Sequence, residues 1–353
     1  MLRNTWQSIA TVFLIMVVSL CVLTAPALTG KARAEVIRLT FNQFNPPGTT
    51  VARVFEQWEK WVEEKSGGRV DIKLHHGGSL LKMKEAYRGV QKGMVDGSLY
   101  ILNSDDGFKL NSVITLPFMG WPSQRETTRI YQAIRKQFPE IDKEWKGVKL
   151  IGAFMMPPTA IHTVKAIVKT PEDLKGLKMN GMELTLVQTI HAAGATPVSL
   201  DPSDMYMSLD RGLVQGVLNI FPVLDVFGVL GLLPYHTILG EGGINMTPIC
   251  NIMNAESFNK LPPDIQKIFE ESGEFWANAF ETLDAKQQES TMNSCKEKKH
   301  TFTYLTSEQI RVWRDLVKYP VHEKWIEENE AKGLPGKAIY NAASKLLEQH
   351  NRK

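Results

Sequence analysis

The segment GLKMNGMELTLVQTIHAAGATPVSLDPSDMYMSLDRGLVQGVLN, residues 176–219, alternates between extended and helical patterns. Short apolar runs with the character of strands occupy residues 177–180, 196–199 and 214–218. Helical patterns, each stopped by a glycine, occupy the stretches between them, residues 184–191 and 202–210. Because strands that alternate with helices pack as layers around a shared core, this segment predicts an α/β fold.

The end of this segment has a counterpart further upstream. An acid, a tyrosine and two glycines keep one spacing in both copies, Glu85, Tyr87, Gly93 and Gly97 against Asp204, Tyr206, Gly212 and Gly216. A helix that ends at a left-handed glycine and leads at once into a strand explains each copy. The repeat predicts two similar lobes; the alternative is a chance match, since helix caps commonly use glycine.

The rest of the chain extends this pattern. Strands are expected at residues 36–42, 69–75, 97–102 and 148–154, and helices near residues 51–62, 83–92 and 124–138. This order favours a mostly parallel sheet with helical crossovers. Residues 161–168 are interpreted as the crossing into the second lobe. The helix predicted from Ile265 to about Lys299 would span about 50 Å, enough to brace both lobes.

The N-terminus predicts export. Residues 1–34 contain Arg3, an apolar run from Val12 to Leu23, and a small-residue triplet ending at Ala34, which are typical of a secretory signal peptide. The run is shorter than the roughly 20 residues of a membrane span, and an uncleaved anchor is the alternative. Without residues 1–34, which hold three of the 41 basic residues and no acid, 38 basic residues face 38 acids. A formally neutral mature chain does not predict nucleic-acid binding.

The chemistry-bearing residues predict neither catalysis nor a metal. The sequence has no nucleophile elbow, zinc-protease helix, P-loop or dinucleotide-binding glycine motif. His75 and His76 are neighbours on an expected strand and point to opposite faces, and the other six histidines show no ligand spacing. No cofactor is therefore expected, although an exported enzyme is the alternative from another class. Whether Cys250 and Cys295 pair is left open.

The candidate binding residues come from the strand ends. In open α/β sheets, ligands bind beyond the carboxyl ends of the strands. Reading those ends in order gives Asn42, Phe44, Tyr100, Asn103, Met155, Met156, Asn180, Asn219 and Phe221. Amides, aromatic rings and thioethers suit a small organic solute held by a few hydrogen bonds between apolar walls. The alternative at each position is a turn or core residue.

Motifs along nearly the whole mature chain carry a resemblance to a known family. Among them are SGGRV at 66–70, GSL at 78–80, LPFM at 116–119, TPEDLKGLKM at 170–179, GATPV at 194–198 and GLVQGVLN at 212–219. In order and spacing they resemble the solute receptors of the tripartite ATP-independent periplasmic (TRAP) transporters, dicarboxylate-receptor type. The resemblance implies a two-lobed, periplasmic-binding-protein-like fold with hinge strands and a long helix spanning both lobes.

The chain departs from that family at one position. Members usually carry an arginine two residues after the lysine of the Gly-Leu-Lys motif, where it binds the carboxylate of the ligand, and here the position is Asn180. A second arginine of many members is replaced in the crossing strand by His162 and Lys165. We therefore expect a neutral, zwitterionic or largely apolar solute, with Glu183 as a partner for an amine. A carboxylate held by Lys165, Lys178 or an arginine of the first lobe is the alternative.

The resemblance also implies a function. A periplasmic receptor of this kind closes on its solute and delivers it to membrane permease subunits of a TRAP transporter. A receptor for an ATP-driven importer and a sensor subunit share the same sequence features. The expected division is residues 35–158 with about 245–285 in the first lobe, and residues 159–244 with about 286–353 in the second.

Overall fold

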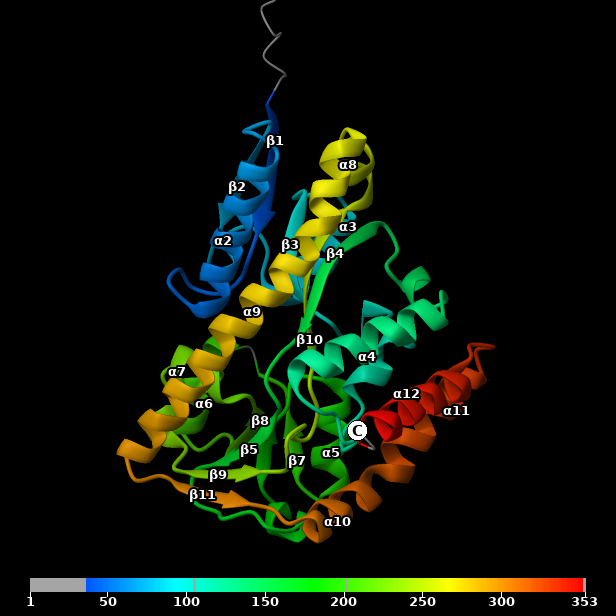
Figure 1. Ribbon diagram of the computed structural model, residues 1–353. Helices are drawn as coiled ribbons and strands as arrows, with labels where there is room; N and C mark the ends of the chain where they lie inside the picture. Colours follow the sequence, from blue (N-terminus) through cyan, green and yellow to red (C-terminus); the bar gives the residue numbers. More distant parts are fainter. Residues whose placement is uncertain (1–35, 104–105, 201, 352–353) are drawn as a thin grey trace, which may run out of the picture. The chain divides into compact units, whose positions relative to one another are not determined.

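Two mixed β-sheets organise the chain in the computed structural model, which describes residues 36–103, 106–200 and 202–351 (Figure 1). The contacts between residues divide the chain into two units, Met1–Ile37 and Arg38–Lys353. The elements described below belong to the second unit, except for Ile37, the first residue of β1. The predicted signal peptide lies outside the described residues. Within the described ranges no helix is both long and apolar enough to cross a membrane.

The first sheet has the strand order β2-β1-β3-β10-β4. Its strands are β1 (Ile37–Asn42), β2 (Val70–His75), β3 (Gly97–Ile101), β4 (Val148–Met155) and β10 (Pro248–Asn254). Strands β1 and β3 are parallel, as the sequence predicts, whereas β10 lies antiparallel between β3 and β4. The expectation of a mostly parallel sheet therefore fails at β10.

The second sheet has the strand order β11-β9-β5-β8-β6-β7. Its strands are β5 (Ala160–Thr163), β6 (Lys178–Asn180), β7 (Thr196–Val198), β8 (Gly216–Asn219), β9 (Tyr235–Ile238) and β11 (Thr301–Tyr304). Strand β5 is antiparallel to both β8 and β9, and the other neighbours are parallel. The segment 176–219 thus forms β6, β7 and β8, with the expected helices between them.

Two crossing segments join the sheets. The chain leaves β4 and enters the second sheet as β5, and it leaves β9 and returns to the first sheet as β10. The segments bond to each other, because Met156 N donates to Thr247 O at 2.9 Å and Thr159 N donates to Asn245 O at 2.9 Å. Each crossing leads into a strand that is antiparallel to its neighbours, β5 in the second sheet and β10 in the first. The first crossing precedes β5, so it lies before residues 161–168, which were interpreted as the crossing. Of these residues only 161–163 belong to a strand.

The sequence repeat corresponds to a structural repeat. A 3-10 turn, a six-residue helix, a glycine at positive φ and a strand follow in both copies, as η1 (Met83–Glu85), α3 (Ala86–Gln91) and β3, and as η6 (Pro202–Asp204), α6 (Met205–Asp210) and β8. The second glycine of each copy pairs with a parallel neighbour, Gly97 with Phe41 and Gly216 with Met179. A Cβ at Gly97 would lie 2.1 Å from the Phe41 ring, and one at Gly216 would lie 2.5 Å from His162 O. Close strand packing explains both glycines.

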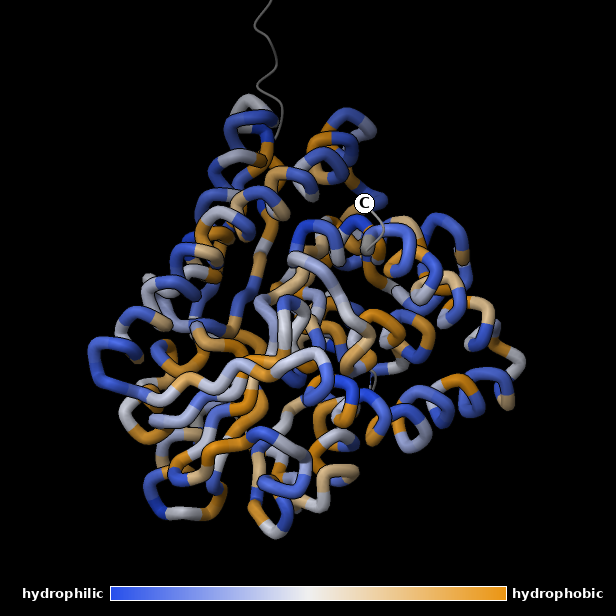
Figure 2. The backbone as a smooth tube through the Cα atoms, turned by 60° about the horizontal axis from the view of Figure 1, so that its bottom comes forward, coloured by the Kyte–Doolittle hydropathy of each residue, from blue (hydrophilic) through white to orange (hydrophobic). Residues whose placement is uncertain are grey.

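Helix α9 (Pro263–Glu297) has 35 residues, close to the predicted bounds (Figure 1). It packs against α2 (Thr50–Lys65) and β4 beside the first sheet, and against α7 (Phe221–Val226) beside the second. Trp58 Nε1 donates to Ser272 Oγ at 2.9 Å within this buried contact. In Figure 2 the outer turns of the helices are mainly hydrophilic, and hydrophobic segments follow the interior. The predicted long brace is therefore present.

The C-terminal helices connect regions assigned to different lobes. They are α10 (Ser307–Val317), the π-helix η8 (Lys318–Glu323), α11 (Lys324–Glu330) and α12 (Gly336–Asn351). Thr306 and Gln309 form a capping box at the start of α10. Trp325 Nε1 donates to Ser112 Oγ at 2.8 Å, and η8 contacts α5 (Leu184–Ala192). Because these helices contact both regions, the lobe boundaries stay a prediction.

The remaining helices cover the sheets. They are α4 (Gln124–Gln137), α8 (Ala255–Asn259) and the 3-10 turns η3 (Asn111–Thr115), η4 (Asp142–Glu144), η5 (Pro171–Leu174) and η7 (Leu230–Leu232). The apolar face of α4 buries Ile130, Tyr131 and Ile134 in the largest core cluster. That cluster also contains Met179 and Leu218 of the second sheet. The opposite face of this sheet carries Val217, which packs with Phe221 and Cys295.

Candidate functional site

One edge of the second sheet brings together three of the predicted residues. Strands β6 and β8 are parallel with Asn180 beside Val217, and antiparallel β5 sets Ala160 opposite Asn219. The carboxyl ends of β6 and β8 therefore meet at the start of β5. Asn180, Glu183 and Asn219 follow or close these strands, as the strand-end argument predicts.

The side-chain oxygen of Asn180 has no hydrogen-bond partner among the described residues. Its side chain is fully buried, and its Nδ2 donates to Val198 O at 2.9 Å. Its Oδ1 is buried and has no hydrogen-bond partner among the described residues. Because a buried polar atom without a partner costs about 1–3 kcal/mol, this oxygen is a candidate ligand contact.

Glu183 connects this edge to the second crossing segment. Its Oε1 accepts a hydrogen bond of 2.6 Å from Thr247 Oγ1, and its Oε2 accepts one of 3.2 Å from Asn245 Nδ2. Burial raises the pKa of the Glu183 carboxyl to about 7, although both hydrogen bonds oppose the shift. Asn245 Oδ1 is buried without a partner in the described part of the chain. A carboxyl that titrates near neutrality therefore lies beside a second free acceptor.

His162, on β5, is buried and is not exposed to solvent. Its side chain is fully buried, its Nε2 donates to Asn219 O at 3.1 Å, and its Nδ1 lies 2.8 Å from His236 Nδ1. Phe221 packs against it with ring centroids 4.8 Å apart. Burial lowers the pKa of His162 to about 4, so the ring is neutral at pH 7. His162 therefore does not supply the positive charge of an arginine.

The predicted residues of the first sheet have polar groups that serve that sheet. Asn42 Nδ2 donates to Leu81 O and to Ser98 Oγ, at 3.1 and 3.2 Å, and its Oδ1 accepts from Leu81 N at 3.2 Å. Tyr100 is buried, and its hydroxyl donates to Asp106 Oδ2 at 3.0 Å. These contacts already satisfy both side chains, and a ligand role for either stays a prediction.

The other expected residues lie in three different settings. Phe44 and Asn103 are partly buried, and Asn103 N donates to the Tyr100 hydroxyl at 3.1 Å. Met156 is partly buried and bonds through its backbone to Thr247, the partner of Glu183. Met156 therefore lies in the first crossing segment, beside the partner of Glu183. The hydrogen bonds given for Glu183 do not include Phe44 or Asn103.

The lysines considered for a carboxylate are at the surface. Lys165 and Lys178 are both exposed. An exposed ammonium is solvated and gains little from pairing with an anion. The geometry gives these two lysines no buried position at the Asn180 edge.

Sequence reasoning missed two sets of residues. Asn245 and Thr247 were overlooked because they lie in a crossing segment before β10 and not at a carboxyl strand end. The interpretation that the other six histidines lack ligand spacing is incomplete, because the fold places His236 and His300 beside Cys295. Cys250 and Cys295 are both free and buried, so no disulfide joins them.

The chain matches the model of the bacterial extracellular solute-binding proteins, family 7, over residues 41–329. It therefore belongs to that family. One relative is the C4-dicarboxylate-binding periplasmic protein DctP of Rhodobacter capsulatus, 24% identical over 85% of this chain and 90% of that protein. Another is the ectoine-binding periplasmic protein TeaA of Halomonas elongata, 23% identical over 80% of this chain and 83% of that protein.

Solved structures share the fold. A TRAP periplasmic solute-binding protein from Desulfovibrio salexigens superposes on this chain with a TM-score of 0.76 and is 28% identical to it. The superposition covers 89% of this chain and 96% of that protein's chain. A TRAP solute-binding protein from Rhodoferax ferrireducens, in complex with copurified benzoate, has a TM-score of 0.80 and 23% identity, covering 90% and 99%. The predicted family and two-lobed fold are confirmed. The relatives and neighbours named above are solute-binding proteins, which confirms the expected class of receptor.

Proposed function

We propose that the chain captures a small organic solute at the edge formed by Asn180, Glu183 and Asn219 and delivers it to the membrane permease of a TRAP transporter. The observation that carries the proposal is the buried Oδ1 of Asn180, which has no hydrogen-bond partner among the described residues and lies at the end of a strand in a fold shared with solute receptors. Export through the predicted signal peptide would bring the receptor to the periplasm.

Closure about the two crossing segments is the proposed mechanism. Glu183 lies between β6 of the second sheet and α5, and its partners Asn245 and Thr247 lie in the second crossing segment. Rotation about the crossings changes the surroundings of Glu183. A solute that contacts both sides stabilises the closed form and so shifts the population toward it.

The free atoms of the site favour a solute that donates hydrogen bonds. Asn180 Oδ1 and Asn245 Oδ1 are acceptors only, and both are buried without partners in the described residues. Hydroxyl, amide and ammonium groups satisfy such oxygens. An asparagine at position 180 supplies no charge for a dicarboxylate, so a neutral or zwitterionic solute fits better. The relative TeaA is named for ectoine, a zwitterion, whereas DctP is named for C4-dicarboxylates.

A monocarboxylic acid is the second candidate. Structural neighbours hold benzoate and (R)- and (S)-mandelate. Because the Glu183 pKa is raised to about 7, a substantial fraction of its carboxyl is protonated near neutral pH. The protonated group can donate to a ligand carboxylate, which an ionised group cannot do. An acid held in this way would bind more weakly above pH 7.

Native mass spectrometry of the exported, tag-free protein tests the proposal. We expect one intact small molecule per chain, and its release and identification show whether it carries donor groups, a carboxylate or both. Incubation of the released compound with fresh protein should leave it chemically unchanged. Conversion to a product, or an empty protein without thermal shift across acids, amino acids and polyols, would contradict a receptor.

A further inference from the structure

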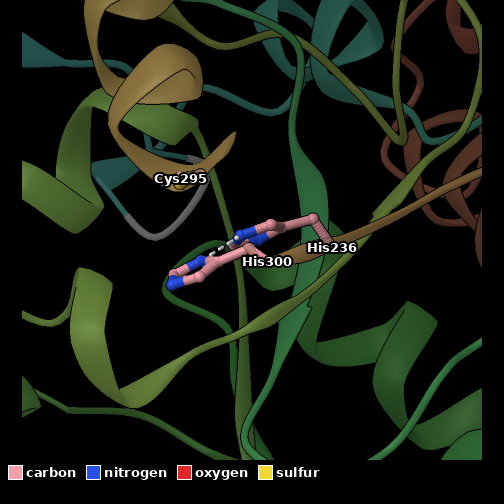
Figure 3. Close-up of side chains that lie close together, drawn as sticks. All are labelled: His236, Cys295 and His300. Atoms are coloured by element: carbon pink, nitrogen blue, oxygen red, sulfur yellow. Dashed lines mark hydrogen bonds between the residues drawn. The ribbon is translucent and has the colours of Figure 1, made fainter. Parts of the chain in front are cut away.

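A second cluster of side chains lies on the face of the second sheet that is covered by the end of α9. It consists of His236 on β9, Cys295 in the last turn of α9 and His300 just before β11. One possible ligand atom of each residue lies within 4.8 Å of the other two, and Figure 3 shows the two imidazole rings side by side. We propose that these three residues bind a zinc ion, with a fourth position left for water.

The end of α9 explains why Cys295 and His300 meet. His300 N donates to Cys295 O at 3.0 Å, and Lys299 N donates to Lys296 O at 2.9 Å. With Lys299 at φ 59°, these bonds form a Schellman motif. The motif usually brings two apolar side chains together at the positions that Cys295 and His300 occupy. Here the same geometry brings a thiol and an imidazole together. The left-handed position, where glycine is usual, is occupied by Lys299.

A chain of hydrogen bonds fixes the proton positions of the histidines. The Asn219 carbonyl only accepts, so His162 Nε2 carries a hydrogen, and Nδ1 of the neutral His162 ring is an acceptor. His236 Nδ1, 2.8 Å away, must therefore donate. The Nε2 of His236 therefore carries a lone pair, which accepts a hydrogen bond from His300 Nδ1 at 3.0 Å. This is the form in which a histidine binds metal, with its other nitrogen held by a hydrogen-bond partner.

The donor set suits zinc. Imidazole nitrogen and thiolate sulfur are its common ligands, and three protein ligands with one open position are a known arrangement. Zn–N and Zn–S bonds of about 2.0 and 2.3 Å require donor atoms about 3.3–3.6 Å apart in a tetrahedron. The two nitrogens lie 3.0 Å apart and one ligand atom of each residue lies within 4.8 Å of the others, so side-chain movements on the order of 1 Å complete this geometry.

Binding requires the loss of one proton from Cys295, a change of tautomer in His300 and the breaking of the His236–His300 hydrogen bond. The S–H bond of Cys295 breaks as the S–Zn bond forms, and the proton passes to solvent. His300 binds through Nδ1 and carries its proton on Nε2 instead. His236 and Cys295 are buried, whereas His300 is partly exposed and offers a route for the ion. The bound ion would tie the end of α9 to β9 and, through His162, to the Asn219 carbonyl.

Metal titration of the exported, tag-free full chain tests this inference. After chelator treatment and reduction of the thiols, zinc is titrated against a chromophoric chelator, and Co²⁺ serves as the spectroscopic probe. We expect one zinc per chain and a thiolate-to-cobalt charge-transfer band. Cys295→Ser should abolish the band, and both Cys295→Ser and His300→Gln should weaken zinc binding at least about tenfold. His191→Gln, which alters an exposed histidine of α5, is the matched control and should bind like wild type.

The outcomes separate a metal site from a structural cluster. Circular dichroism of the metal-free variants establishes that they fold. If Cys295→Ser does not fold, His300→Gln still tests the inference, because His300 is partly exposed. Zinc should also raise the Tm of wild type and not that of His300→Gln. Absence of saturable binding, or equal affinity in wild type and His300→Gln, would overturn the inference. Neither outcome depends on the solute, so this test is independent of the receptor proposal.

Discussion

Glu183 Oε1 accepts a hydrogen bond of 2.6 Å from Thr247 Oγ1, which joins the loop after β6 to the segment that returns to the first sheet. The sequence separation of these residues is large, so the bond exists only when the second sheet and the crossing are assembled. Burial raises the pKa of this carboxyl to about 7. Solution pH therefore changes the charge at a contact that closure would alter.

Glu183→Gln should flatten the dependence of stability on pH between about 4.5 and 7. The folded state holds the Glu183 proton more tightly than the unfolded chain, because its pKa is raised from 4.5 to about 7. The contribution of this group to stability is therefore complete below pH 4.5 and is lost as the pH rises through 7, by on the order of 3 kcal/mol. Urea unfolding of both proteins across this range measures it, and parallel curves would contradict the assignment.

His162→Ala should lower the free energy of unfolding by about 3 kcal/mol. The substitution leaves a cavity beside Phe221 and removes the partners of Asn219 O and His236 Nδ1. It should also reduce acid sensitivity. The pKa of His162 is lowered to about 4 in the fold, so its stabilising contribution declines as the pH falls from 6.5 toward 4. His191→Ala is the surface control, expected within about 0.5 kcal/mol of wild type.

Gly216→Ala should destabilise the fold by about 1–3 kcal/mol. The new Cβ would lie 2.5 Å from His162 O and 2.7 Å from Met179 Cε, between strands whose backbones cannot separate without loss of their pairing. Gly231→Ala is a matched control, because a Cβ there meets nothing within 4 Å and its φ is not positive. Chemical unfolding compares the two. Equal stability of both variants would show that β8 adjusts freely.

The sequence predicted those elements that have local signals. Residues 176–219 contain three strands and their helices because apolar periodicity and glycine stops mark them. No strand was predicted at β10, since all seven of its residues are buried and no alternation reveals its partner or direction. Its antiparallel position depends on the return crossing, which is a property of the whole chain.

The candidate site was predicted in part for the same reason. Asn180 and Asn219 follow from the rule that ligands bind at strand ends, and Glu183 lies close to them in sequence. Asn245 and Thr247 could not be found in this way, because their role arises from contact with Glu183 more than 60 positions away. The cluster of His236, Cys295 and His300 likewise depends on pairing between β9 and β11. Neither set has a spacing that sequence alone reveals.

Calorimetric titration of the solute released from the protein tests the central claim most directly. The comparison is between wild type, Asn180→Ala, and Asn293→Ala, which alters an exposed asparagine of α9. If Asn180 Oδ1 accepts a hydrogen bond from the solute, Asn180→Ala should weaken binding by about 1–2 kcal/mol, roughly five- to thirtyfold, while Asn293→Ala leaves it unchanged. Equal affinity in all three proteins would contradict a binding site at the Asn180 edge.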